Sequence, residues 1–317
     1  MRLRCNVVDV GARYGLHPTW EDLRDVVSLY LFEMDTKEAR RLKRKYVSSR
    51  NITIYPYALY SSDCKIKYKV RCHQGLSSLF DNDTTVRKSK NFLIKEAAIV
   101  SKKTAQARAI DPFFEDKEIH FLKIDAEGAE LEVLKGAQLH LDSSVLGIRM
   151  ETYFVPVNRN MPLFGDIHTF LKKYKFELIN FDYDGRGHAL SKFTLPYKYG
   201  QFIASESVWV KDIKEIFKQK KNKIASDVIV LALFLMNNHA TDIALSILLK
   251  AKSRKGVNFT VFKNDPIFRT LKRKVAFLFK DMLSLPSVNT KEIYSTYKKI
   301  FGEAFPVMNK FYETFSL

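Results

Sequence analysis

A short apolar stretch near the start of the chain runs directly into a turn rich in small residues, VVDVGARYG at Val7–Gly15. The next apolar stretch ends at an acid, Glu33, in LFEMD. Glycine lets a backbone pass close to a ligand because it carries no Cβ. A carboxylate at the tip of a second strand accepts hydrogen bonds from both hydroxyls of a ribose. Together, the two segments predict a nucleoside-binding site in a sheet with crossover helices.

The spacing of the turn is DxGxxxG, with Asp9 ahead of Gly11 and Gly15, rather than GxGxxG. A pyrophosphate is bound by a helix N-terminus and free backbone N–H groups. S-adenosylmethionine has no phosphate and carries a sulfonium cation, so a carboxylate beside the turn favours this ligand over a dinucleotide. A dehydrogenase is a distant alternative, because the central glycine of the dinucleotide motif is missing.

A second acidic turn follows an apolar strand in FLKIDAEGAELEVLKGA, Phe121–Ala137. Ligands of open α/β sheets bind at the carboxyl ends of the strands, where Asp125 and Glu127 lie. Two neighbouring carboxylates repel each other and lose solvation when buried, a cost that a cationic ligand offsets. We predict that both face the positive charge of the cofactor. Glu130 is interpreted as a cap, because acids are favourable near a helix N-terminus.

Apolar stretches alternate with helical patterns up to about residue 211, which predicts a mostly parallel sheet with crossover helices. Lys65–Arg71 and Thr104–Ile110 alternate with period two and predict an added hairpin or edge pair, with a polar loop or lid between them. One helix is expected from Gly128 to Leu139. The seven strand candidates are Cys5–Val10, Val26–Phe32, Asn51–Tyr57, Ile119–Ile124, Val145–Met150, Phe176–Phe181 and Phe202–Val210.

Taken in order, five segments resemble the FkbM family of S-adenosylmethionine-dependent methyltransferases: VVDVGARYG, LFEMD, ARAID, FLKIDAEGAELEVLKGA and GIRMET. The resemblance covers about residues 5–211, and KIDAEGAE followed by VLKGA is its most specific part. It implies an α/β fold of the class I methyltransferase type, with a Rossmann-like, seven-stranded, mostly parallel sheet. It also implies O-methylation, so we expect methyl transfer to a hydroxyl of a sugar, a glycan or a similar small molecule.

Carried over by position, the resemblance assigns a cofactor site. Asp9, Gly11 and Gly15 are implied to line the methionine end of S-adenosylmethionine, with Ala12 of the same turn also binding the cofactor. Asp125, a further cofactor residue, and Glu127 are implied to face the methyl group and the acceptor. Glu33 would bind the ribose, and the segment Tyr57–Asp63 would lie near the adenine. Asp111 matches an acid that the family carries ahead of its KIDxEG strand, with a turn cap as the alternative.

The implied reaction is an in-line displacement at the methyl carbon of a sulfonium, so alignment of nucleophile, carbon and sulfur contributes most. A hydroxyl has a high pKa, so a base helps. The predicted catalytic carboxylates are Asp125, Glu127 and Glu151. Glu151 has an alternative role as a buried structural carboxylate paired with Arg149 or a lysine. His73 and His168 are weaker candidates for the base.

The segment CHQGLSSLF is the predicted acceptor side, through His73, Ser77 and Ser78. No metal site is predicted. Mg²⁺ held by Asp125 and Glu151 is the alternative, because hard oxygen ligands suit this ion, but it is not favoured.

The chain after residue 211 lies outside the resemblance and contains long helical stretches with no clear strand. We expect a methyltransferase domain at residues 1–211 and a basic, all-α extension of unassigned role at residues 212–317, with the boundary within Asp212–Lys223. The stretch ALFLMNNHATDIALSILLKA predicts two helices joined at Asn237–His239. A homo-oligomer formed through these helices is left open.

The net charge is +18, and a basic surface attracts nucleic acid, anionic membranes or phosphorylated substrates. We find no (D/N)PP(Y/W) amino-methylation motif and no dense stripe of arginine and aromatic residues, so nucleic acid is not favoured as a partner. The expected partner is a small-molecule or glycan acceptor, with a phosphorylated one included. Methylation of RNA is the first alternative function, and a non-catalytic methyltransferase-like module is the second.

Cys5, Cys64 and Cys72 are odd in number and lack metal-binding spacing, which argues against a disulfide framework or a zinc site. The longest apolar run, Val228–Met236, is too short to cross a bilayer. The first residues pass directly into a strand pattern rather than a leader-like one. These features predict no transmembrane segment and a cytoplasmic location.

Overall fold

The structure is a computed structural model that describes residues 2–182, 185–188, 200–283, 289–302 and 305. Contacts between residues divide it into two compact units. The larger unit is Cys5–Asp212, and the helical unit joins Met1–Arg4 to Ile213–Leu317. This division differs from the predicted domains in grouping Met1–Arg4 with the helices that follow residue 212.

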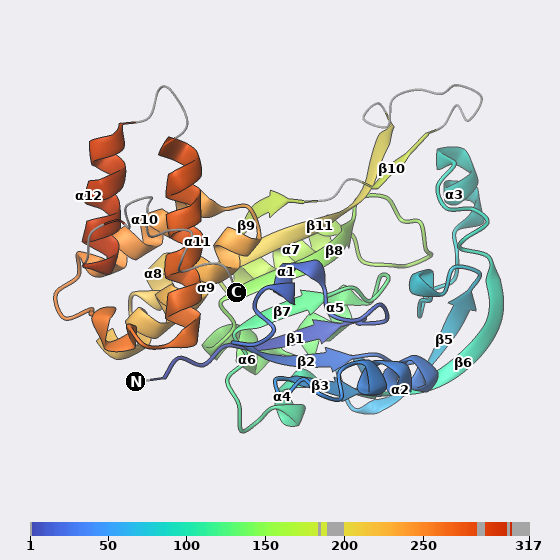
Figure 1. Cartoon of the computed structure of the whole chain (residues 1–317). Helices are drawn as coiled ribbons and strands as arrows, with labels where there is room; N and C mark the ends of the chain where they lie inside the picture. The colour runs from blue at the N-terminus through green and yellow to red at the C-terminus, as the bar shows by residue number, and fades with distance from the viewer. Residues whose placement is uncertain (1, 183–184, 189–199, 284–288, 303–304, 306–317) are drawn as a thin grey trace. The chain divides into compact units, whose positions relative to one another are not determined.

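The larger unit is built on one sheet (Figure 1). Its strands are β1 (Asn6–Val10), β2 (Ser28–Phe32), β3 (Ile52–Tyr55), β7 (Phe121–Ile124), β8 (Gly147–Tyr153), β9 (Phe176–Phe181), β10 (Gly185–Gly187) and β11 (Gln201–Lys211). The order is β10-β11-β8-β7-β1-β2-β3, with β9 beside β11. Strands β1, β2, β3, β7 and β8 run parallel, whereas β11 runs antiparallel to its three neighbours. The predicted Rossmann-like, mostly parallel sheet is confirmed.

The seven predicted strands are all present, and β10 is an eighth. It pairs with the start of β11, on the same edge where β9 pairs with the end of β11. The sheet therefore stays seven positions wide.

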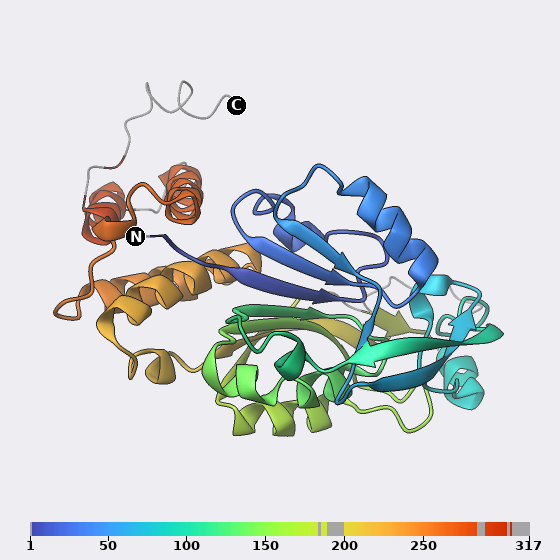
Figure 2. The same ribbon diagram turned by 90° about the horizontal axis from the view of Figure 1, so that it is seen from below.

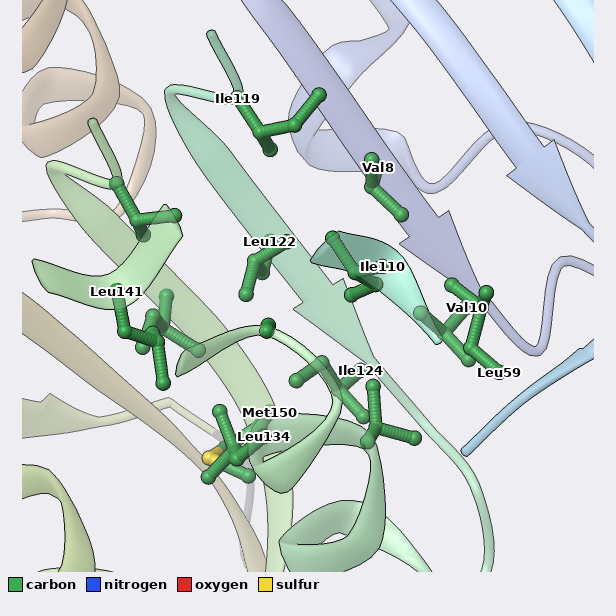
Figure 3. Packing of buried hydrophobic residues seen from close by; sticks show 14 of the residues in the cluster. Val8, Val10, Leu59, Ile110, Ile119, Leu122, Ile124, Leu134, Leu141 and Met150 are labelled. Atoms are coloured by element: carbon green, nitrogen blue, oxygen red, sulfur yellow. The ribbon is translucent and has the colours of Figure 1, made fainter. Parts of the chain in front are cut away.

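The central strands are apolar in succession because both faces of the sheet are covered. Val8 on β1 and Leu122 and Ile124 on β7 are fully buried. They pack against Ile110 and Leu134, which come from helices (Figure 3). Burying one such side chain stabilises the fold by about 1.5–3 kcal/mol, so this layer fixes the sheet whose strand ends carry the polar residues.

Helices lie on both faces of the sheet. The helices of the larger unit are α1 (Pro18–Glu21), α2 (Thr36–Lys45), α3 (Thr84–Lys90), α4 (Ile110–Phe113), α5 (Glu130–Lys135), α6 (Gln138–Ser143) and α7 (Phe164–Lys173), with a 3-10 turn η1 (Gln74–Leu76). Figure 2 shows α2 on one face and α5, α6 and α7 on the other. α2 begins at Thr36, because the side chain of Asp35 accepts hydrogen bonds from the N–H groups of Lys37 and Glu38.

A second, three-stranded sheet extends from the main one. It contains β4 (Ala58–Leu59), β5 (Cys64–Arg71) and β6 (Ile99–Arg108) in the order β4-β6-β5. The predicted antiparallel pair is confirmed as β5 with β6, with Ile66 opposite Ala105. β4 was not predicted, because two residues are too few to show a period.

The segment between β5 and β6 differs from the predicted loop. It holds η1 and the helix α3, which the side chain of Asp83 caps by accepting a hydrogen bond from Val86 N. Asn91 ends α3 in the left-handed conformation. Sequence periodicity misses this helix because Val86 is its only large apolar residue. The side chain that the helix buries is that of Arg87.

The single helix predicted from Gly128 to Leu139 is wrong, because the structure divides the segment into α5 and α6. The interruption falls at Gly136, where an added Cβ would lie 2.0 Å from the carbonyl oxygen of Tyr60. The backbone is therefore pressed against a neighbouring segment at the point where the first helix ends.

The helical unit contains α8 (Ile213–Ile216), α9 (Lys221–Asn237), α10 (Thr241–Lys252), α11 (Pro266–Leu283) and α12 (Thr290–Phe301), with a 3-10 turn η3 (Thr260–Phe262). The predicted pair of helices is confirmed as α9 and α10, which pack against each other. α9 is apolar around its circumference and buried from Val228 to Leu235, as expected of a central helix. None of the helices in the described part of the chain has the length and apolarity that a membrane crossing requires.

Two glycines give a test of the packing at the break between α5 and α6. We expect Gly136→Ala to destabilise the protein by about 1–3 kcal/mol, the usual cost of overpacking. Gly165→Ala is the matched control, because nothing lies within 4 Å of its added methyl group, and alanine in a helix is favoured by up to about 1 kcal/mol. Urea unfolding of both variants measures the difference, and equal stabilities would contradict the proposed contact.

Candidate active site

A cleft opens at the carboxyl ends of β1, β2 and β7, and it has an empty volume of about 890 Å³ that includes space open to solvent. The residues of these strand ends that line it are Val10, Gly11, Phe32, Glu33, Asp125 and Glu127. Its opposite wall is apolar and comes from β4 and β5, through Leu59, Ile66 and Tyr68. The predicted position of the site, at the edge where parallel strands end, is therefore where the structure has its cleft.

The glycine turn is determined by close approach to β7. Gly11 has φ +79°, and an added Cβ would lie 2.0 Å from the carbonyl oxygen of Asp125. The N–H groups of Gly11 and Ala12 both donate to the carbonyl of Phe32, at 3.0 Å. Gly15 also has a positive φ, but its Cβ would meet the hydroxyl of Tyr46. Gly11 thus faces the cleft, whereas Ala12 and Gly15 are not among the residues that line it.

Glu33 lies at the end of β2 and lines the cleft. One carboxylate oxygen accepts a hydrogen bond from Asp35 N at 2.6 Å, which fixes the side chain. Burial raises the pKa of Glu33 to about 7. The segment predicted to lie near the adenine contributes Tyr57, Ala58 and Leu59 to the same cleft. β5 was not predicted to contribute, although its alternation places Ile66 and Tyr68 on one face.

A buried lysine joins two of the predicted acids. Lys123 lies opposite Asp9 in the β1–β7 register, and its Nζ is 3.8 Å from Asp9 Oδ1 and 3.1 Å from Asp125 Oδ2. Burial lowers the pKa of Lys123, but the two carboxylates outweigh burial and raise it overall. Asp9 is 1% exposed and lies beneath the cleft rather than in its lining. Sequence reasoning missed Lys123, whose signal was one lysine inside the apolar strand FLKI.

Glu127 occupies a strained turn. Its φ is +53°, and that of Gly128 is +104°. A residue with a side chain is uncommon in this region, and such strain persists where surrounding contacts hold it. Here Ser78 Oγ donates to the carbonyl of Glu127 at 2.6 Å. Glu130 accepts from the N–H groups of Ala126 and Gly128, which confirms its predicted role as a cap.

Tyr153 connects Glu127 to Glu151. Its hydroxyl lies 3.1 Å from Glu127 Oε2 and 2.9 Å from Glu151 Oε2. A hydroxyl has one hydrogen to donate, so Tyr153 can donate to only one of the two glutamates. The second contact is completed by a proton on a carboxyl group, which donates to the tyrosine oxygen. Burial, followed by repulsion from the other acids, raises the pKa of both glutamates. Tyr153 was missed, although residues 151 and 153 share a face of β8 because side chains alternate along a strand.

Asp125, Glu127 and Glu151 each offer a carboxylate oxygen within 4.8 Å of the others. Such a set of hard oxygen ligands fits Mg²⁺ in chemical type. However, Lys123 already supplies a cation to Asp125, and Tyr153 already bridges the two glutamates. The absence of a metal stays a prediction.

Of the predicted acceptor residues, Ser77 lines the cleft, whereas Ser78 is buried beneath it and His73 is not in its lining. His73 Nε2 lies 3.4 Å from the hydroxyl of Tyr14. The neighbouring Gln74 also contacts the glycine turn, by accepting a hydrogen bond from Arg13. The predicted acceptor segment therefore runs beside the glycine turn.

The alternative roles of three further residues are resolved by their contacts. Arg149, the alternative partner of Glu151, pairs with Asp182 and Glu206. Asp111 accepts hydrogen bonds from Leu139 N and from both backbone and ring nitrogens of His140, which makes it a turn cap. His168 packs against the rings of Phe164 and Trp209, which also stack on each other.

Comparison with solved structures finds several methyltransferases at low identity. An FkbM methyltransferase from Methylobacillus flagellatus KT is 15% identical, with TM-score 0.40, over 65% of this chain and 43% of that one. The chain thus spans less than half the length of that relative. A magnesium protoporphyrin IX methyltransferase from Synechocystis PCC 6803, solved with bound SAM, is 8% identical, with TM-score 0.33, over 67% and 71% of the chains. An rRNA methylase from Streptococcus thermophilus is 9% identical, with TM-score 0.33, over 67% and 89%.

No curated protein matches the chain. The Methyltransferase FkbM domain, as a family, matches residues 9–178. This span is more than half of the chain and includes the glycine turn, the acidic turn after β7 and Glu151 on β8. The chain belongs to the FkbM methyltransferase family.

Proposed function

We propose that this protein transfers the methyl group of S-adenosylmethionine to a hydroxyl of a sugar, a glycan or a similar small molecule. The observation that supports this most directly is the convergence of Gly11, Glu33, Asp125 and Glu127 on one cleft. A methyl donor and a base for a hydroxyl both need to be within reach of one point, and these residues meet that requirement.

The cofactor would lie across the ends of β1 and β2. Glu33 would accept hydrogen bonds from the ribose hydroxyls, and the apolar wall of Leu59 and Ile66 suits the adenine. The carboxylate of Asp125 is 38% exposed on its side chain and faces the cleft, so it can attract the cationic end of the methyl donor. Gly11 places the backbone of the glycine turn in the wall of the cleft, where it can contact the donor.

In the proposed reaction the acceptor oxygen attacks the methyl carbon in line with the departing sulfur. The leaving thioether is neutral and needs no acid. The acceptor loses its proton to Glu127, which lines the cleft and whose pKa is raised by burial. Tyr153 joins Glu127 to Glu151, so this pair can hold the proton until solvent removes it. General base catalysis of this kind contributes about 10²–10⁴-fold.

Transfer of a labelled methyl group tests the class of acceptor. The full chain is incubated with methyl-labelled S-adenosylmethionine and with free sugars, nucleotide sugars or total RNA, and the products are separated by mass. A sugar that gains the mass of one methylene group supports the proposal. Label found only in RNA would replace it with the alternative that the net charge of +18 supports.

Glu33→Ala tests the ribose contact. We expect S-adenosylmethionine to bind about 1–3 kcal/mol more weakly, because charge-assisted hydrogen bonds are lost. Titration calorimetry measures this change. Glu21→Ala is the matched control, since Glu21 is exposed and outside the cleft. An affinity that is the same in both variants would show that Glu33 does not bind the cofactor.

Glu127→Gln tests the base. We expect kcat to fall about 10²–10⁴-fold, while the affinity for S-adenosylmethionine changes little. Glu132→Gln provides the control, because Glu132 pairs with Lys135 and does not line the cleft. A full rate in the Glu127 variant would assign the base to another residue.

The pH dependence of kcat should follow the same carboxylate. Burial raises the pKa of Glu127 to about 8, and the group accepts a proton only when it is ionised. We therefore expect kcat, measured at saturating cofactor, to increase from pH 6 toward about pH 9 and then to level off, with the bound sulfonium moving the midpoint downward. The Glu127→Gln variant should lack this dependence. A wild-type profile that is flat over this range would contradict the assignment.

A further inference from the structure

Two buried arginines lie close to each other and interact with the charge of Glu127. Arg71 ends β5 and is 0% exposed, and Arg87 lies on α3 and is 3% exposed. Both use Nη2 to donate to the same acceptor, the side-chain oxygen of Asn158, at 2.8 and 3.0 Å. Arg71 Nη2 also donates to the carbonyl of Phe80 at 3.3 Å. Three segments that are distant in sequence therefore bring two cations to one buried point.

Most donors of this pair have no acceptor. Within the residues that the structure describes, Nε and Nη1 of both arginines make no hydrogen bond, and neither does the amide nitrogen of Asn158. Burial, together with repulsion from Arg87, lowers the pKa of Arg71 to about 10. Buried charges are normally paired and hydrogen-bonded, because an unpaired buried charge lowers the stability of the fold. The arrangement lacks a negative partner.

The nearby glutamates do not supply that partner. Glu127 attracts both arginines, Asp81 also attracts Arg71, and Glu151 also attracts Arg87. Neither guanidinium, however, forms an ion pair with a carboxylate of the described chain. The glutamate oxygens are instead directed to Tyr153. Buried water would satisfy some N–H groups, yet it would leave two neighbouring positive charges unopposed. An anion satisfies both requirements.

We propose that Arg71, Arg87 and Asn158 bind an oxyanion, a phosphate or a carboxylate, that the methyl acceptor carries. Guanidinium groups match both anions with parallel hydrogen bonds. The inference rests on the proposed function, because it assigns the anion to the acceptor whose hydroxyl reaches Glu127. It narrows the acceptor class to acidic sugars and to sugar phosphates or nucleotide sugars.

Arg87 lies on α3, so an anion bound at the pair would contact this helix. The helix has seven residues, and most of its side chains are exposed. An anion held by Arg87 should therefore fix α3 more firmly. Hydrogen exchange of the α3 amides should slow when the anion binds, and the helices of the helical unit serve as the internal reference.

Thermal unfolding of the full chain tests the site without requiring methyl transfer. The probes are inorganic phosphate and glucuronate, each compared with sodium chloride at equal ionic strength. We expect at least one probe to raise the midpoint by about 5 °C at one hundred times its Kd. A larger shift with phosphate indicates a phosphorylated acceptor, and a larger shift with glucuronate indicates an acidic sugar. If neither exceeds chloride, the proposal is overturned.

Arg87→Met removes one cation, and Arg159→Met is the matched control, since Arg159 is exposed and adjacent to Asn158 in sequence. Without the anion, Arg87→Met should unfold at the same temperature as the wild type or higher, because an unpaired buried charge has been removed. It should bind the anion at least about tenfold more weakly, whereas Arg159→Met should bind it normally. An undiminished shift in Arg87→Met would overturn the proposal.

If Arg87→Met does not fold, Arg87→Lys keeps the charge but lacks the planar fork of donors, and it should also lose at least about tenfold in anion affinity. Calorimetry with S-adenosylmethionine is run on the same samples. Cofactor binding without anion binding would reject this inference and leave the proposed function standing. Anion binding without cofactor binding would reject the proposed function and leave the anion site standing on its own.

Discussion

The contact between Gly11 and the carbonyl of Asp125 is the constraint on which the site depends. Gly11 follows β1 and Asp125 follows β7, and these strands are neighbours in the sheet. A Cβ at position 11 would lie 2.0 Å from that oxygen, while Asp125 N donates back to Val10. The glycine turn and the acidic turn therefore start from one shared point. Glu33 follows β2, and Glu127 lies in the acidic turn. Their positions in the cleft follow from where these two segments leave this shared point.

Charge is arranged around this contact in two groups. Lys123 lies between Asp9 and Asp125 and compensates the acids closest to the glycine turn. Glu127 and Glu151 form no ion pair within the described residues and are joined by the hydroxyl of Tyr153 instead. Lys123 opposes the charge of the first group, whereas burial raises the pKa of both glutamates in the second group and makes it adjustable by a proton. A site that binds a cation and also takes up a proton needs both kinds of carboxylate.

Local sequence was sufficient for the sheet and for the position of the cleft at its strand ends, because buried parallel strands are apolar in succession and their ends expose polar turns. DxGxxxG, Glu33 and KIDAEG could all be interpreted in this way. Features that depend on tertiary contacts could not be predicted from local sequence. The break at Gly136 is set by the backbone of Tyr60, and α3 presents a buried arginine where periodicity seeks an apolar residue. The grouping of Arg71 and Arg87 on Asn158 joins residues up to 87 positions apart, which no local pattern reveals.

The two halves of the site have different origins in the chain. The proposed cofactor contacts come mainly from the ends of β1, β2 and β7, whose positions the buried core fixes. Arg71 and Arg87 come from β5 and from the segment between β5 and β6, outside the main sheet. Changes in the inserted segment can therefore alter which acceptor is bound while the strand ends, and with them the methyl donor, stay in place.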